Sequence, residues 1–80
     1  MPQYRPPINS WYNQICVPDP ITPFTVLAQY GYQFKKIKKQ SKVDYIWYDR
    51  HRHVVEVWSR DQRKLVNAIN MLKRLVIPNF

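Results

Sequence analysis

One stretch decides the fold class: residues 59–76, SRDQRKLVNAINMLKRLV. Its apolar side chains recur at steps of three and four, which is the period of a helix with one buried face. They are Leu65, Ala68, Ile69, Leu72 and Val76. Ser59 and Gln62 have the spacing of a capping box, and Pro78 stands where the helix would end. We therefore predict a C-terminal amphipathic helix that begins just after Ser59.

Upstream of this helix the sequence predicts three strands. Residues 43–48 (VDYIWY) and 55–58 (VEVW) are rich in β-branched and aromatic side chains, and Arg50-His51-Arg52 forms the turn between them. Residues 11–17 (WYNQICV) have the same composition and end at Pro18. These three segments are expected to pair into one small sheet.

Two further helices are predicted between the first strand and the second. Thr22 followed by Pro23 is a helix-start signal, and we expect this helix to stop at Gly31, which is the only glycine. A second helix follows, because Phe34, Ile37 and Ser41 share one face. The predicted fold is α+β, in the order β-α-α-β-β-α.

The chain of 80 residues has room for one domain. Residues 1–10 contain Pro2, Pro6 and Pro7 and are predicted to form an extended arm, and residues 11–80 the domain itself. Cys16 is the only cysteine, so no internal disulfide is expected. No signal peptide and no apolar run long enough for a bilayer is evident, so we expect an intracellular protein, cytoplasmic or nuclear, without a membrane partner.

The charge of the chain is strongly positive. The chain contains thirteen Lys and Arg residues and five Asp and Glu residues, which gives a net charge of +8. Residues 35–52 alone hold five lysines and two arginines against Asp44 and Asp49, a net charge of +5. Such an excess favours a polyanionic partner, although basic side chains can also serve solubility alone.

Several of these motifs resemble the KH domain family in its eukaryotic type I order. Val17-Pro18 matches the start of the family pattern, Phe34-Lys35-Lys36-Ile37 stands at its Ile-x-x-Ile position, and Leu65-x-x-Ala68 begins a final helix of the right spacing. The signature Gly-x-x-Gly loop would be Ala28-Gln29-Tyr30-Gly31, in which only the second glycine is present. The resemblance covers residues 15–76 and implies a three-stranded antiparallel sheet with three helices on one face.

The resemblance implies that the protein binds single-stranded nucleic acid without catalysing a reaction, with RNA as the first expectation and DNA as the other. It places the site in a groove between the signature loop, the second helix and the turn after the second strand. The candidates for an apolar floor of this groove are Val26, Leu27, Phe34, Ile37 and Tyr45. The residues expected to bind are Ala28, Gln29, Tyr30, Gly31, Phe34, Lys35, Lys36, Ile37, Lys39, Lys42, Tyr45, Arg50 and Arg52.

An alternative hypothesis makes the domain a protein-interaction or homo-oligomerisation module that has lost nucleic-acid binding. It rests on Ile46, Tyr48 and Trp58, which are predicted to lie on the sheet face away from the helices. Either the arm or a second subunit, as in a homodimer, would cover that face.

Catalysis, metal binding and cofactors are not expected. The five acids are scattered, and no nucleophile has a base at a suitable spacing. His51 and His53 could bind a metal only with a third ligand, and the sequence offers none beside them.

Overall fold

The computed structural model describes residues 9–77 of the chain. Its elements, in chain order, are β1 (Trp11–Cys16), α1 (Pro23–Thr25), η1 (Val26–Tyr30), α2 (Gly31–Ser41), β2 (Tyr45–Asp49), β3 (Val54–Ser59) and α3 (Gln62–Val76). The η1 segment is π-helical. The fold is therefore α+β, as predicted. The predicted arm falls mainly on residues 1–8, which lie outside the described residues.

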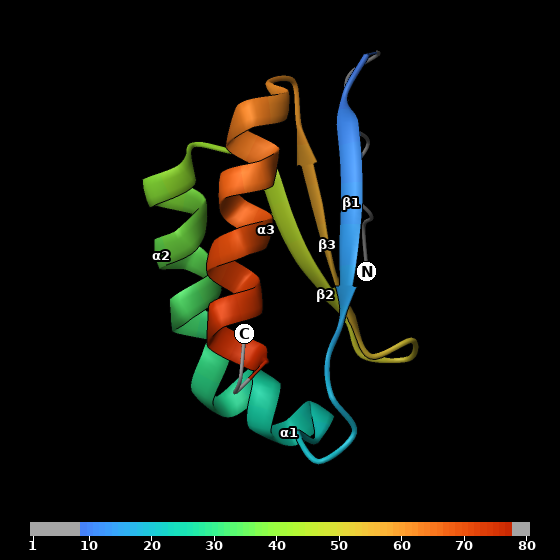
Figure 1. Cartoon of the computed structure of the whole chain (residues 1–80). Helices are drawn as coiled ribbons and strands as arrows, with labels where there is room; N and C mark the ends of the chain where they lie inside the picture. The colour runs from blue at the N-terminus through green and yellow to red at the C-terminus, as the bar shows by residue number, and fades with distance from the viewer. Residues whose placement is uncertain (1–8, 78–80) are drawn as a thin grey trace.

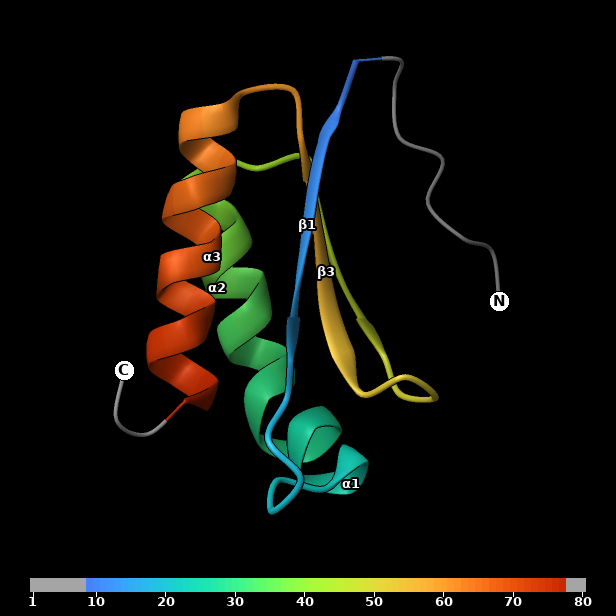
Figure 2. The ribbon, with the colours of Figure 1, turned by 45° about the vertical axis from the view of Figure 1, so that its right-hand side comes forward.

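The three strands form one antiparallel sheet with β3 in the middle, in the order β1-β3-β2. Both α2 and α3 cover the same face of this sheet, with α1 and η1 curled under one end of the molecule (Figures 1 and 2). Since β1 and β2 are the two edge strands, one side of β2 has no neighbouring strand. Helix α2, which covers one face of the sheet, contacts β2.

The structure has two helical segments among residues 9–77 where three separate helices were predicted. The segments α1, η1 and α2 follow one another without a break, and Gly31 is right-handed with φ −55° and ψ −45°. The predicted helix end at Gly31 is therefore wrong. Val26, Phe34 and Ile37 are all buried, and Tyr30 packs against the same core. Their three- and four-residue spacing favours one helical path through the glycine.

The helix starts are capped by side chains. Thr22 Oγ1 accepts a hydrogen bond of 3.2 Å from the Thr25 N–H, as expected from the Thr-Pro signal. Asp61 caps α3, its Oδ1 accepting from the N–H groups of Arg63 and Lys64. The predicted cap, Ser59, instead belongs to β3, and its Oγ accepts from the Asp61 N–H. Strand β3 thus extends to Ser59, the residue that was expected to cap the C-terminal helix.

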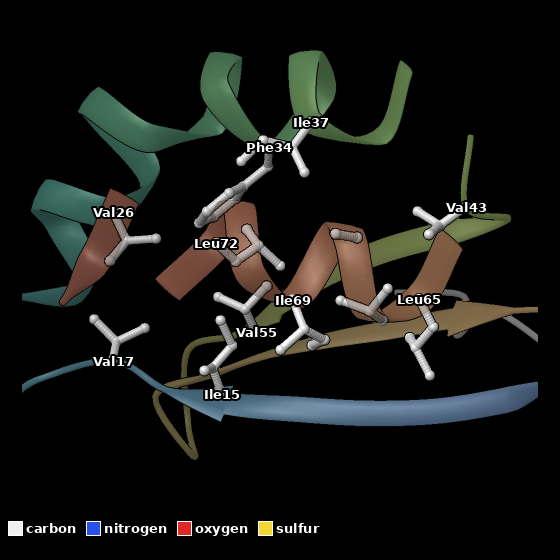
Figure 3. Close-up of a cluster of buried hydrophobic side chains, with 12 residues drawn as sticks. Ile15, Val17, Val26, Phe34, Ile37, Val43, Val55, Leu65, Ile69 and Leu72 are labelled. Atoms are coloured by element: carbon white, nitrogen blue, oxygen red, sulfur yellow. The ribbon is translucent and has the colours of Figure 1, made fainter. Parts of the chain in front are cut away.

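The core lies between the sheet and the two long helices (Figure 3). All five residues of the predicted apolar face of α3 are buried, and Leu72 is fully enclosed. Phe34 and Ile37 reach toward it from α2, while Ile15 and Val55 reach toward it from the sheet (Figure 3). The periodicity of residues 59–76 therefore predicted the face of the helix that the core buries.

The register of the sheet corrects the predicted faces of β2. Ile46 lies opposite Val57, and Tyr48 opposite Val55, so both side chains point toward the helices and pack on the core. The prediction that Ile46 and Tyr48 face away from the helices is wrong, whereas Trp58 does lie on the open face with Tyr45. The error arose because Tyr45, Ile46, Trp47 and Tyr48 are all apolar. In such a run the sequence does not show which alternate residues face the helices and which face away.

Candidate nucleic-acid interface

The outer face of α2 gathers most of the predicted cations into one open hollow. This lysine hollow has a volume of about 680 Å³ and is lined by Tyr32, Lys35, Lys36, Lys39, Gln40 and Lys42. The gathering follows from the helix itself, since Phe34, Ile37 and Ser41 are turned into the core and the residues between them face outward. The four lysines that were expected to bind nucleic acid therefore share one surface.

In the described part of the chain, no acidic side chain forms an ion pair with the lysines of this hollow. Within residues 9–77 the ion pairs join Arg52 to Glu56 and Arg60 to Asp44, and none involves these four lysines. The helical residues from Pro23 to Ser41 contain no Asp or Glu at all. The hollow is consequently a site of concentrated, uncompensated positive charge.

Keeping these cations together works against the stability of the helix. Like charges three or four residues apart, such as Lys35 and Lys39, destabilise a helix by about 0.2–0.5 kcal/mol per pair. The helix dipole favours Lys38 and Lys39 in the last turn but not the lysines further from the C-terminus. Lys42, where α2 ends, is left-handed with φ 61°, a conformation in which glycine or asparagine is preferred. Fold stability therefore does not account for these lysines.

A second hollow lies where the helical segment meets the edge strand β2. This strand-edge pocket has a volume of about 460 Å³ and is lined by Leu27, Trp47, Tyr48, Asp49, Arg50 and His51. Leu27 comes from η1 and is 58% exposed, while the other five follow one another through the end of β2 into the turn. Asp49 Oδ1 fixes this turn by accepting hydrogen bonds from the His51 and Arg52 N–H groups.

The predicted groove floor is only partly present. Val26, Phe34 and Ile37 belong to the core, so they are closed to a ligand. Tyr45 lies on the opposite face of the sheet, beside Trp58. Of the residues expected in the floor, Leu27 alone lines the strand-edge pocket.

The residues of the predicted signature loop are helical. Ala28, Gln29 and Tyr30 lie in η1, and Gly31 begins α2. The segment continues the helix and does not form an open glycine loop. An ideal Cβ built on Gly31 would meet nothing within 4 Å. The expected close approach of backbone to phosphate therefore has no counterpart in this segment.

The two arginines of the predicted site are separated. Arg50 lines the strand-edge pocket. Arg52 turns to the open face of the sheet, where its guanidinium donates to Glu56 Oε1 at 2.9 Å and to Gln14 Oε1 at 2.7 Å. Only Arg50 is thus placed to act together with the pocket.

An aromatic row crosses the open face of the sheet. It consists of Tyr12, Trp58 and Tyr45, whose neighbouring ring centroids are 5.1 and 5.9 Å apart, and Lys38 Nζ lies 5.7 Å from the centroid of Tyr45. The Tyr12 hydroxyl donates to Glu56, and burial followed by this hydrogen bond raises its pKa above 10.0. Whether residues 1–10 cover this face, as hypothesised, falls largely outside the described residues.

The histidines of the turn have separate roles. His53 Nε2 donates to the Ile21 carbonyl at 2.6 Å, so its Nδ1 accepts from the Tyr48 hydroxyl. His53 thereby ties the start of β3 to the loop before α1. Across residues 9–77, no three His, Cys, Asp or Glu side chains gather in a way that could hold a metal ion. No helix in the described part of the chain is long and apolar enough to cross a bilayer.

Sequence reasoning missed five residues that line these hollows: the polar residues Gln40, Asp49 and His51, and two aromatic residues. Tyr32 lies in the lysine hollow and Trp47 in the strand-edge pocket. Tyr32 precedes Lys35, Lys36 and Lys39 by three, four and seven residues, so helical spacing alone could have revealed it. Trp47 could not be found in this way, because its position depends on the phase of β2.

Comparisons with known proteins give no further guidance: no protein family, no curated protein and no solved structure matches the chain.

Proposed function

We propose that the protein is a non-catalytic domain that binds single-stranded nucleic acid, RNA or DNA. The observation that carries this proposal is the convergence of Lys35, Lys36, Lys39 and Lys42 on one hollow, with no ion pair to an acidic side chain among residues 9–77. A phosphate backbone is the ligand that such a surface favours, because each bound phosphate releases condensed counterions.

Phosphates and bases would use different parts of the surface. The lysines contact the backbone and give affinity without sequence information. The strand-edge pocket, with Leu27 and Trp47 as apolar walls and Arg50 at its rim, receives an unstacked base. The helical segment 26–41 borders both hollows, so one strand can reach both.

We further propose that the domain is a KH-like variant. The element order and the antiparallel sheet, covered on one face by helices, support this assignment. Two features depart from the family pattern: the signature loop is replaced by a π-helical turn, and Phe34 and Ile37 are buried. Binding would therefore depend on side-chain cations rather than on backbone N–H groups of a glycine loop.

The test is a salt series of fluorescence anisotropy with labelled homopolymers of RNA and DNA. Replacing Lys35, Lys36 and Lys39 by glutamine should weaken binding to all sequences alike. It should also flatten the slope of log K against log[salt] by about 2, since each phosphate contact contributes about 0.7 for a single strand.

The matched control removes the same charge from the exposed side of α3, by Arg63→Gln, Lys64→Gln and Arg74→Gln. This control variant should keep a slope close to that of the wild type. If both triple variants lose affinity and slope equally, binding reflects net charge only, and the lysine hollow is not the site. The molecular mass in solution, measured in parallel, shows whether a homodimer forms.

A further inference from the structure

Tyr32 is a large aromatic residue that the core does not use. Its side chain is 75% exposed on the outer face of α2, although burial of an aromatic ring is favourable. Among the six large hydrophobic residues described as exposed, Tyr32 is the one that lines the lysine hollow. Packing of the fold therefore gives no reason for an aromatic ring at this position.

The ring and the ammonium groups are arranged along one strip of the helix surface. Lys35, Lys36 and Lys39 follow Tyr32 by three, four and seven residues, which are the spacings of neighbours on one face. With a rise of 1.5 Å per residue, the strip from Tyr32 to Lys39 is about 10 Å long. A flat apolar group thus stands at one end of a short cationic track.

A ring beside a cationic track is the arrangement by which proteins bind single strands. Bases stack on the aromatic ring while the cations follow the backbone, and stacking is tolerant of sequence because every base has a π-face. In a duplex both faces of an internal base are already covered by its neighbours. The ring can therefore act only on an unpaired base, whereas the lysines act on any phosphate.

We infer that Tyr32 stacks on an unpaired base in the lysine hollow and makes this surface select single strands over duplexes. The inference rests on the proposed function and adds to it the residue that determines strand selectivity. Tyr32 is distinct from the strand-edge pocket, which would receive a different base of the same strand.

The experiment compares Tyr32→Ala and Tyr32→Phe with the wild type. The probes are a labelled single-stranded RNA homopolymer and an RNA duplex with the same number of phosphates. Tyr32→Ala should weaken single-strand binding by about 5- to 140-fold, the range expected for one stacked base. Its salt slope and its duplex affinity should stay unchanged, because no charge is removed. Tyr32→Phe should retain single-strand affinity, because the ring remains.

The outcomes separate this inference from the proposed function. The role of Tyr32 would be overturned by any of three results. These are equal losses of affinity for single strand and duplex in Tyr32→Ala, no loss of affinity in Tyr32→Ala, or a loss of single-strand affinity in Tyr32→Phe. If the lysine variants still lose affinity and slope in these cases, the proposed function stands without it. A wild-type protein that binds neither probe overturns both. Circular dichroism of each variant checks folding. We expect both variants to fold, because the Tyr32 side chain is exposed.

Discussion

Replacing Gly31 by alanine tests the helical path of the segment that joins η1 to α2. Gly31 has φ −55° and ψ −45°, and an ideal Cβ there would meet no atom within 4 Å. Alanine can therefore adopt the native conformation without strain. It restricts the unfolded chain more than glycine does, and its helix propensity is higher.

The expected gain in the free energy of unfolding is about 0.4–1 kcal/mol. For a domain of this size, such a gain raises the Tm by about 2–8 °C. Urea unfolding followed by circular dichroism would show a higher midpoint with an unchanged m-value. The reverse change in the same helical segment, Ala28→Gly, should lower stability by about 0.5–1 kcal/mol.

Binding gives the functional half of the same test. If the backbone at Gly31 had to approach a phosphate closely, Gly31→Ala would lower affinity for single strands. Since the segment is helical, we expect affinity to remain that of the wild type. A loss of stability, or a loss of affinity in a stably folded Gly31→Ala variant, would refute this reasoning and restore a loop at residues 28–31.

Two further predictions concern stability. Asp61→Ala should lower the free energy of unfolding by about 1 kcal/mol, because the first N–H groups of α3 lose their acceptor. Asp61→Asn should retain most of the wild-type stability, because the asparagine side chain can still accept these hydrogen bonds. An equal loss of stability in both variants would show that the cap is unimportant. Burial raises the pKa of Tyr12 and Tyr48 above 10.0, so stability should be complete below pH 10 and decline as the pH rises through the folded-state pKa. In urea unfolding at alkaline pH, the stability of a double Tyr12→Phe, Tyr48→Phe variant should decline less steeply with pH than that of the wild type. Parallel declines of the two proteins would contradict the role given to these tyrosines.

The sequence predicted well wherever a single element carried its own signal. The apolar period of residues 59–76 identified the buried face of α3, and Phe34, Ile37 and Ser41 identified that of α2. Because the lysines occupy the remaining positions of α2, their place on a common outer face followed as well. Local periodicity is enough for this, since a helix fixes the directions of its side chains without help from other elements.

Prediction failed where the answer depended on contacts distant in the sequence. The glycine at position 31 does not end the helix, because Val26 and Phe34 are buried and the partly buried Tyr30 packs on the same core along one continuous helical path. The faces of Ile46 and Tyr48 depended on pairing with β3. Arg52, expected in the site, is held by Gln14 on a different strand.

By itself the sequence determined the order of the strands and helical regions, the buried faces of α2 and α3, and the surplus of positive charge. Tertiary structure alone decided which residues of β2 face the helices, how Leu27 meets the turn after β2, and that the chain stays helical through its only glycine. The physical reason is that hydrogen-bond register and core packing join residues far apart in the chain. A strand whose residues are all apolar takes its phase from its partner, not from its own pattern.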